Sequence, residues 1–410
     1  MTEFEKIKRD YAELAVRSGI RLQKGQRLVI SCPVECADFA RLCAEAAYDA
    51  GCREVIMRWN DDELRRMRYL KAADEVFDSV DSWDVDFYDS LSAEGAAFLS
   101  IDAEDPDCLS GVDPDRIKRS QISRGKALAA YRMRMMRSEY QWCVCSVPSK
   151  AWAKAVFPDM SEDEAVKRLW SEILTACRAD KGDAVRRWKE HTDEITKHVE
   201  IMNSYDFKTL RYKNQAGTDV TFDLPEGHYW AGGEEKSAGG IMFSANIPTE
   251  EVFTLPDRNS VNGTLVATKP LSLNGTVIEG FSFIVEDGKI TEVHAERGEE
   301  VLKNAISVDE GASYFGEVAL VPHDSPISNS GVLFYNTLFD ENASCHFAFG
   351  EAYPCIKGAE DMSEDELKAR GMNTSMTHVD FMVGSPDLEI TGITRDGREI
   401  AVFRNGNFVF

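Results

Sequence analysis

The order of apolar and polar residues predicts alternating helices and strands in the first half of the chain. Apolar residues recur at helical spacing over 3–18 and over 36–51, which favours two helices. The second would end at Gly51. Helical patterns continue over 161–178, where Ser161 and Glu164 fit a capping box, and over 181–203. Short apolar runs fit buried strands at 27–31, 53–59, 96–102 and 141–149. Strands separated by helices indicate an α/β domain with a mostly parallel sheet.

After about residue 205 the pattern changes to short strands separated by turns. Asn-Gly or Asp-Gly pairs, typical of hairpins, stand at 274–275, 287–288, 396–397 and 405–406. Helical patterns are confined to short segments such as 298–306 and 363–370. We therefore predict an α/β domain over 1–205 and an α+β domain, rich in antiparallel β structure, over 206–410.

Composition narrows the range of partners. The chain has 410 residues, of which 43% are hydrophobic, and a net charge of −24. Such an acidic chain is not expected to bind nucleic acid, because phosphates require a basic surface, or to dock on an anionic membrane. No apolar run approaches the roughly 18 residues of a membrane span. The charged start, MTEFEKIKRD, also lacks the apolar core of a signal peptide.

The ten cysteines and the distribution of charge point to a reduced, cation-attracting protein. The cysteine spacing matches no disulfide framework and no zinc ribbon, so we interpret these residues as reduced, buried thiols in a cytoplasmic protein. Residues 206–410 contain 33 acidic and 15 basic residues. A cleft rich in carboxylates would attract metal ions or the ammonium group of a peptide N-terminus.

Common catalytic fingerprints are not found in the sequence. There is no phosphate-binding loop, no glycine pattern of a dinucleotide site, no HExxH and no GxSxG. A redox enzyme of the Rossmann type is therefore disfavoured, although the first half has the alternating pattern.

Acidic and histidine residues among apolar neighbours mark four segments of the second half. Glu250 and Glu251 precede an apolar pair, and as neighbours on a strand only one of them would face a given site. Glu317 lies in an apolar run, where a lone carboxylate is costly to bury unless it is paired or bound to metal. His378 and Asp380 are two apart on an apparent strand, so both leave the same face, as in a partial metal site. The remaining segment contains Asp340, Glu341, His346 and Tyr353.

Each of these signals taken alone is more often structural than functional. Together they supply two histidines and three carboxylates between residues 251 and 380, a set that suits two divalent ions with nitrogen and oxygen ligands. The segments lie too far apart in the sequence for a site on a single loop. Only the fold can bring them together.

Four motifs resemble the thermophilic aminopeptidase family in order and spacing: NIPTEEVFTLPD, GEVALVPHDSPIS, LFDENASCHFAFGEAY and HVDFMVGS. The similarity to the family's sequence is strongest over about residues 240–390 and is weaker in the first half of the chain. It implies a homodimeric metallo-aminopeptidase that holds two divalent metals in its C-terminal domain, commonly zinc or cobalt, with magnesium or manganese as alternatives. The ligands that it implies are Glu251, Glu317, His346, His378 and Asp380. Tyr353 matches the family's active-site tyrosine.

The resemblance also implies a chemistry for peptides with a free N-terminus. Glu317 is expected to bridge two ions about 3.5–4 Å apart and to be essential for catalysis. Water activated between the ions would attack the first peptide carbonyl, and Tyr353 would donate a hydrogen bond to the developing oxyanion. Either Glu251 or Glu341 would carry the proton to the leaving amine, and the sequence leaves that choice open.

Two rival hypotheses use the same ligands. One is a two-metal amidase or dipeptidase that acts on another amide substrate. The other is a catalytically silent metal-binding protein, which would bind metal without turnover.

Overall fold

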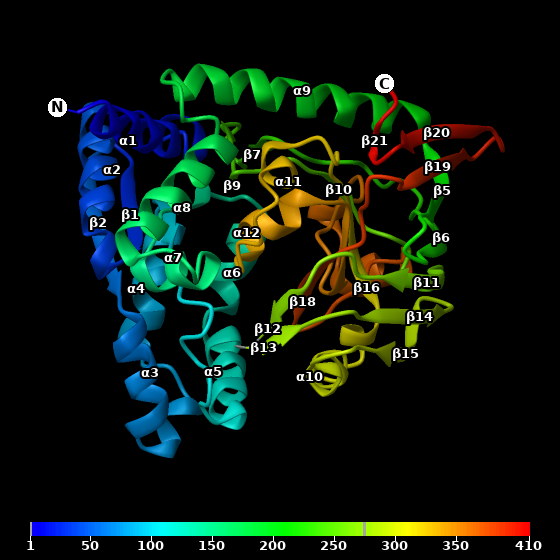
Figure 1. The fold of residues 1–410 in the computed structure, drawn as a ribbon, viewed down its shortest axis with the longest axis horizontal. Helices are drawn as coiled ribbons and strands as arrows, with labels where there is room; N and C mark the ends of the chain where they lie inside the picture. Colours follow the sequence, from blue (N-terminus) through cyan, green and yellow to red (C-terminus); the bar gives the residue numbers. More distant parts are fainter. Residues whose placement is uncertain (1, 274–275) are drawn as a thin grey trace. The chain divides into compact units, whose positions relative to one another are not determined.

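The computed structural model describes residues 2–273 and 276–410, and the chain divides into two compact units (Figure 1). The first unit comprises Met1–Thr192 and Glu234–Pro248, and the second comprises Asp193–Gly233 and Thr249–Phe410. A stretch of the later chain therefore returns to the first unit. The predicted boundary between residues 205 and 206 falls inside the second unit, and it stays a prediction.

A parallel sheet forms the centre of the first unit, with the strand order β2-β1-β3-β4-β9. Its strands are β1 (Arg27–Pro33), β2 (Glu54–Asn60), β3 (Ala97–Asp102), β4 (Trp142–Ser146) and β9 (Asn246–Ile247). All pairings between neighbouring strands are parallel. The four predicted strands are all present, and the returning segment adds β9. The α/β fold expected for this part of the chain is confirmed.

Helices connect the strands of the first unit, as the alternating pattern predicts. They are α1 (Glu3–Leu14), α2 (Ala37–Asp49), α3 (Asp62–Lys71), α4 (Ser82–Ala93), α5 (Pro114–Ala127), α6 (Ala129–Met136), α7 (Lys150–Val156) and α8 (Glu162–Ala176). The predicted capping box starts α8, where the backbone N–H of Ser161 donates to the Glu164 carboxylate at 3.2 Å. A short hairpin, β7 (Glu235–Lys236) with β8 (Met242–Phe243), belongs to the returning segment. The long helix α9 (Ala184–Tyr205) leads into the second unit.

Antiparallel sheets build the second unit. One has eight strands in the order β15-β14-β11-β6-β5-β19-β20-β21, and another has four in the order β10-β16-β17-β18. The larger sheet consists of β5 (Phe207–Lys213), β6 (Asp219–Asp223), β11 (Asn262–Val266), β14 (Ser282–Glu286), β15 (Lys289–His294), β19 (Glu389–Thr394), β20 (Glu399–Arg404) and β21 (Asn407–Phe408). The smaller consists of β10 (Val252–Thr254), β16 (Phe315–Leu320), β17 (His346–Gly350) and β18 (His378–Met382). The expected antiparallel character of this domain is confirmed.

Short elements complete the second unit. They are the pair β12 (Leu271–Leu273) and β13 (Thr276–Ile278) and the helices α10 (Glu299–Ala305), α11 (Pro326–Ser330), α12 (Thr337–Asp340) and α13 (Glu364–Ala369). The turn pairs at 287–288, 396–397 and 405–406 connect paired strands, as predicted. The predicted turn at Asn274-Gly275 lies outside the described residues.

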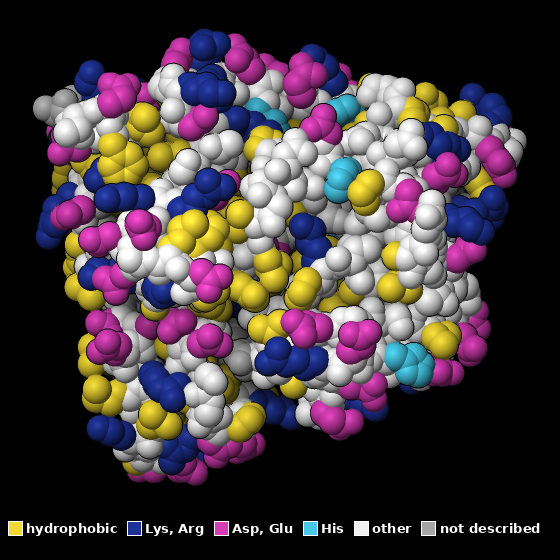
Figure 2. All heavy atoms as spheres, viewed as in Figure 1, with side chains coloured by type: hydrophobic (Ala, Val, Ile, Leu, Met, Phe, Trp, Pro, Cys, Tyr) yellow, Lys and Arg dark blue, Asp and Glu magenta, His cyan; other side chains and the backbone are white. Residues whose placement is uncertain are grey.

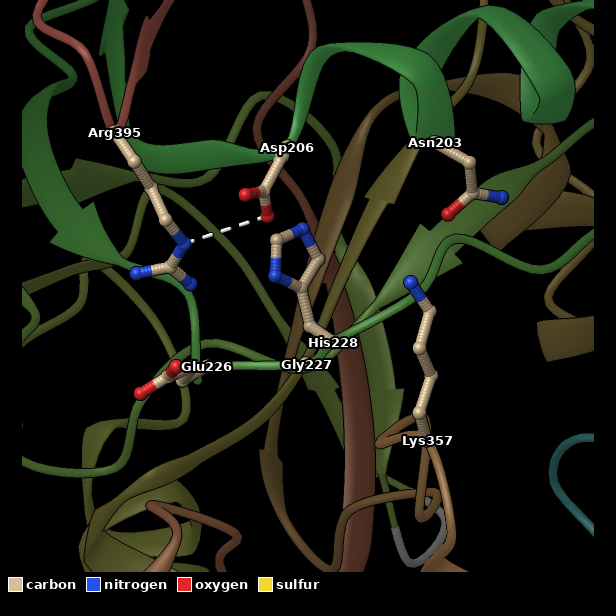
Figure 3. A pocket seen from close by; sticks show the side chains of 7 residues that line it. All are labelled: Asn203, Asp206, Glu226, Gly227, His228, Lys357 and Arg395. Carbon is tan, nitrogen blue, oxygen red and sulfur yellow. Dashed lines mark hydrogen bonds and ion pairs between the residues drawn. The ribbon is translucent and has the colours of Figure 1, made fainter.

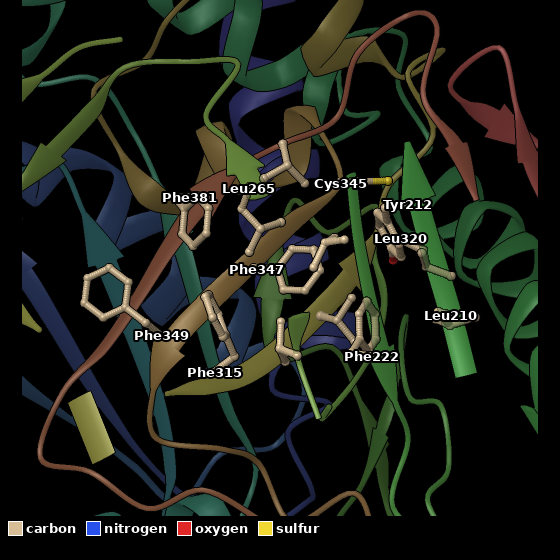
Figure 4. Close-up of a cluster of buried hydrophobic side chains, with 14 of the residues drawn as sticks. Leu210, Tyr212, Phe222, Leu265, Phe315, Leu320, Cys345, Phe347, Phe349 and Phe381 are labelled. Atoms are coloured by element: carbon tan, nitrogen blue, oxygen red, sulfur yellow. The ribbon is translucent and has the colours of Figure 1, made fainter. Parts of the chain in front are cut away.

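An aromatic core lies between the two large sheets of the second unit (Figure 4). Phe347 of β17 contacts Tyr212 of β5 and Phe222 of β6, with ring centroids 5.5 and 5.4 Å apart. Burying aromatic side chains on the facing sides of both sheets stabilises the pair of sheets. The opposite face of the smaller sheet remains available for polar side chains.

The cysteines are buried, and the surface carries charges of both signs. All ten cysteines are free and buried, which confirms their interpretation as small core residues. The face drawn in Figure 2 shows acidic and basic side chains interspersed. Within the described part of the chain, no helix has both the length and the apolarity that crossing a membrane requires.

Candidate metal centre

Alternation along three strands separates core side chains from site side chains. On β17 and β18, Phe347 and Phe381 belong to the aromatic core. The residues one position away, His346 and Asp380, therefore leave the other face of the sheet. A β-bulge between Phe315 and Glu317 in β16 shifts the register. Without the bulge Glu317 would share the core-facing side with Phe315.

The strand register places a small residue at the centre of this polar face. Ala348 of β17 lies opposite Glu317 of β16 on one side and opposite Asp380 of β18 on the other. His346 lies two residues from Ala348 along β17, and His378 lies two residues from Asp380 along β18. Because the Ala348 side chain is a methyl group, it leaves space between the longer side chains around it.

Five side chains meet above this alanine in two groups that share Glu317. Donor atoms of Glu251, Glu317 and His346 lie within 4.8 Å of one another, and so do those of Glu317, His378 and Asp380. The His346 Nε2 atom is 3.4 Å from Glu251 Oε2 and 3.6 Å from Glu317 Oε1. The His378 Nε2 atom is 3.7 Å from Glu317 Oε2 and 3.3 Å from Asp380 Oδ1. The fold thus brings together all five residues that the resemblance names as ligands.

Backbone carbonyls orient both imidazole rings. The His346 Nδ1–H donates to the carbonyl oxygens of Glu341 and Ser344, at 2.9 and 3.1 Å. The His378 Nδ1–H donates to the carbonyl oxygen of Glu351 at 2.7 Å. In both rings the Nε2 atom therefore faces the carboxylates, which is the arrangement that metal-binding histidines commonly have.

The donor set fits divalent cations. Glu251, Glu317 and Asp380 are largely buried, and among the described residues their only ion-pair partners are the two histidines. Buried carboxylates without a lysine or arginine partner are costly, and a cation removes that cost. Nitrogen and oxygen donors of this kind suit zinc, cobalt and manganese.

The pKa values in this cluster are strongly perturbed. Burial raises the pKa of Glu317 above its ordinary range. Burial alone would lower the pKa of His378, but Asp380 and Glu317 outweigh it and raise the pKa to about 10. The pKa of His346 is also raised, since its contacts with Glu251 and Glu317 outweigh burial. Protons and cations therefore compete for these side chains.

Glu341 and Tyr353, the other predicted site residues, lie beside the five. Burial, followed by the charges of Asp380 and Glu251, raises the pKa of the Glu341 carboxyl well above its ordinary value. The Tyr353 ring packs edge-on against His378, with centroids 6.4 Å apart. The Glu341 carboxyl and the Tyr353 ring therefore border the cluster.

Two other acidic residues of these segments, Asp340 and Glu250, do not belong to the cluster. Asp340 accepts hydrogen bonds from the backbone N–H groups of Phe334 and Asn336, at 2.8 and 3.1 Å, so it holds the preceding loop. Glu250 and Glu251 precede β10 and are both buried, and only Glu251 belongs to the cluster. The expectation that the two glutamates are neighbours on a strand was wrong, because β10 begins at Val252.

Sequence reasoning missed two contributors, Ala348 and Glu351. The bulge and the strand register determine the position of Ala348, and neither can be read from one sequence. Glu351 acts through its carbonyl group, which every residue possesses, so no sequence signal marks it. Its carboxylate also accepts a hydrogen bond from the backbone N–H of Ser375, which fixes the chain just before His378.

Known proteins share this fold and sequence over nearly their full length. The profile of the thermophilic metalloprotease family (M29) matches residues 4–408. The chain belongs to this family. Aminopeptidase 2 of Geobacillus stearothermophilus and aminopeptidase AmpS of Bacillus subtilis are each 44% identical to it. Both alignments cover 100% of this chain, together with 99% of the Geobacillus protein and 100% of the Bacillus protein. The structure of wild-type AmpT from Thermus thermophilus superposes with a TM-score of 0.92 at 38% identity, covering 99% of this chain and 100% of that one.

Membership of the thermophilic metalloprotease family confirms several predictions. The family resemblance of the four motifs is confirmed, and so is the fold class, an α/β part followed by a part rich in antiparallel strands. The prediction that the protein is an enzyme, a metal-dependent hydrolase, is confirmed as well. The family implies a divalent metal cofactor.

Proposed function

We propose that the protein is an aminopeptidase that hydrolyses the first peptide bond of peptides with a free N-terminus, using two divalent metal ions, zinc or cobalt. The observation that carries this proposal is the pair of donor groups that share Glu317. Two adjacent cation sites joined by one carboxylate are typical of hydrolases that use two metals. The names of the relatives, which are aminopeptidases, support the choice of substrate.

Each group of side chains would hold one cation. Glu251, His346 and one Glu317 oxygen would bind the first, and His378, Asp380 and the other Glu317 oxygen would bind the second. When bound, such ions lower the pKa of water and polarise the substrate carbonyl. The hydrogen bonds to the carbonyl oxygens of Glu341, Ser344 and Glu351 would keep both Nε2 lone pairs directed at the cations.

Two further side chains would act on the substrate itself. We assign proton transfer to Glu341, because Glu251 belongs to a cation-holding group while the Glu341 carboxyl lies beside it without being part of either group. Its carboxyl would take a proton from the attacking water and give it to the leaving amine. The Tyr353 hydroxyl would donate a hydrogen bond to the carbonyl oxygen as negative charge develops there.

The acidity of the second half of the chain supports an exopeptidase. Carboxylates attract an ammonium group, so an acidic surface would favour the free N-terminus of a peptide. We also propose that the enzyme works in the cytoplasm, which its ten free cysteines support, and that it forms a homodimer, as the family resemblance implies.

Hydrolysis of chromogenic substrates tests this function. Purified protein is assayed for metal content and for cleavage of leucine p-nitroanilide before chelation, after chelation and after zinc or cobalt is restored. We expect about two ions per chain, loss of activity on chelation and recovery on reloading. Cleavage of N-blocked peptides at a similar rate would instead indicate an amidase, and metal binding without turnover on any substrate would indicate a silent metal-binding protein.

A further inference from the structure

A wholly buried asparagine connects two segments that carry residues of the candidate metal centre. Asn342 is 0% exposed and belongs to the short 3-10 helix Glu341–Ala343, which follows α12 and precedes His346. It is not one of the five side chains whose donor atoms form the two groups. A buried amide needs partners for both its oxygen and its nitrogen, so its contacts show which segments it holds together.

The Asn342 amide has partners on both of its ends. Its Oδ1 atom accepts a hydrogen bond from the backbone N–H of Glu250 at 2.7 Å. Its Nδ2 group donates to the carbonyl oxygen of Leu338 at 3.0 Å and lies 3.4 Å from Glu341 Oε1. Flipping the amide would place N–H₂ against the N–H of Glu250 and the amide oxygen against two other oxygens. Only the orientation seen here satisfies all three contacts.

The contact with Glu250 anchors the backbone beside Glu251. The ladder between β10 and β16 begins at Val252, so it does not include Glu251. The chain re-enters the second unit at Thr249, only two residues earlier. Glu251 therefore lies in a short connection, and the Asn342 oxygen holds that connection one residue before the candidate ligand.

The contact with Leu338 fixes the turn that orients His346. By donating to the Leu338 carbonyl, the Asn342 side chain closes the turn of which it is itself a part. The carbonyl of Glu341 lies in the same turn and accepts the hydrogen bond from His346 Nδ1 at 2.9 Å. A single amide thus holds both the backbone beside Glu251 and the carbonyl group that directs the His346 ring.

We propose that Asn342 is a positioning residue of the first donor group, where it keeps Glu251 and His346 at the separation at which they can share one cation. The second group has support of its own, since the Glu351 carbonyl orients His378 at 2.7 Å. In the described part of the chain, Asn342 forms no hydrogen bond with the segment that carries His378. Removing the Asn342 amide should therefore weaken the binding of one cation and spare the other.

The same amide restrains the carboxyl group to which we assign proton transfer. With Asn342 Nδ2 only 3.4 Å from Oε1, one oxygen of the Glu341 carboxyl has a donor beside it, which limits the rotation of that group. This part of the role of Asn342 rests on the proposed function, because it concerns hydrolysis. The positioning of Glu251 and His346 does not, because cation binding can be measured without turnover.

Titration of the metal-free protein with zinc, in competition with a chelating dye, tests the positioning role. In Asn342→Ala we expect the affinity for one of the two ions to fall at least tenfold and the affinity for the other to stay within twofold. Equal losses for both ions would indicate a general role in the fold and overturn the proposal. Unchanged affinities for both ions would overturn it as well.

Asn203→Ala is the control for the loss of an amide that joins two segments. The Asn203 side chain accepts from the N–H of Trp230 and donates to its carbonyl, both at 2.9 Å. It lines a cavity whose residues do not include any of the metal centre (Figure 3). This variant should bind both zinc ions like the unmodified protein.

Hydrogen exchange tests the anchor without any substitution, so the proposal stays testable even if Asn342→Ala does not fold. In the metal-free unmodified protein, the N–H of Glu250 should exchange at least tenfold more slowly than in an unfolded peptide. Exchange at the unfolded rate would show that Asn342 does not hold this backbone, and would overturn the proposal.

A second variant tests the contact with Glu341 separately. Asn342→Asp keeps the size of the side chain and an oxygen for the N–H of Glu250, but it removes the N–H₂ donor. It should bind both ions with at most threefold weaker affinity, and it should lower kcat for leucine p-nitroanilide at least tenfold with KM within twofold. An unchanged kcat would overturn the part of the proposal that concerns Glu341. If the unmodified protein hydrolyses no peptide, the proposed function fails, whereas selective loss of one ion in Asn342→Ala would still support the positioning role.

Discussion

Replacing the shared carboxylate is the sharpest perturbation of the candidate metal centre. Glu317→Gln keeps the size of the side chain but removes its negative charge, and one of its two oxygens becomes an amide nitrogen. The Glu317 oxygens lie 3.6 and 3.7 Å from the two histidine Nε2 atoms, so a single change alters both donor groups. Gln cannot bridge two cations as a carboxylate does, because its N–H₂ group donates rather than accepts.

The size of the effect follows from distance and burial. Two unit charges about 4 Å apart interact with about 4 kcal/mol at an effective dielectric constant of about 20. Glu317 is only 6% exposed, so water screens this interaction little. Each cation carries two charges, so this energy is a lower bound. Since about 1.4 kcal/mol corresponds to a factor of ten, the affinity for each cation should fall by at least about 10³. Activity should fall at least as far, because both cations are needed.

Competition with a chelating dye measures the metal affinity, and hydrolysis of leucine p-nitroanilide measures the activity. Glu172→Gln is the matched control, because it neutralises a half-buried glutamate that pairs with Arg168 on α8 of the first unit. The control should bind metal and turn over substrate like the unmodified enzyme. If Glu317→Gln retains two tightly bound ions and full activity, the bridging role is refuted.

Four further outcomes are expected. Tyr353→Phe should lower kcat at least tenfold with little change in KM, because the proposed hydrogen bond from its hydroxyl forms mainly in the transition state. Steady-state kinetics will measure both constants, and equal effects on kcat and KM would indicate a role in binding or packing. Ala348→Leu should lower metal content at least tenfold by elemental analysis, because the added atoms fill the space above the sheet; unchanged metal content would contradict this. Asp340→Asn should destabilise the protein by about 1–2 kcal/mol in urea unfolding, because an amide has one acceptor oxygen instead of two and at least one backbone hydrogen bond to it is lost. No change would show that the loop does not depend on these hydrogen bonds. The folded-state pKa of His378, about 10, exceeds its unfolded value of about 6.5, so its stabilising contribution is complete below about pH 6.5 and is lost as the pH rises toward 10. The unfolding midpoint of the chelated protein should therefore fall across that window, and a flat profile would contradict the assignment.

Periodicity was sufficient to predict four of the five strands of the parallel sheet in the first unit. Buried parallel strands are short apolar runs flanked by helices with an apolar stripe, so 27–31 and 141–149 stand out without any tertiary information. The strand β9 was not predicted, because two residues carry no periodic signal. Its pairing depends on the return of the chain to the first unit, which is a property of the whole fold.

The family resemblance named the five candidate ligands, but their geometry could not be predicted from the sequence. His378 and Asp380 are two residues apart on a strand, so the sequence alone indicates that both side chains leave the same face. Glu317 appears in the sequence only as a carboxylate in an apolar run, and the bulge beside Phe315 is what turns it away from the core. Bulges depend on how two strands pair, and this is decided by contacts distant in sequence. The positions of the carbonyl groups that orient the histidines also depend on contacts distant in sequence, so they could not be predicted either.

Anomalous X-ray scattering at the zinc edge, on crystals of the zinc-loaded enzyme, tests the central claim most directly. The account predicts two peaks, one within bonding distance of Glu251 and His346 and the other within bonding distance of His378 and Asp380, with Glu317 contacting both. Zinc peaks elsewhere in the molecule, with these five side chains binding none, would contradict it.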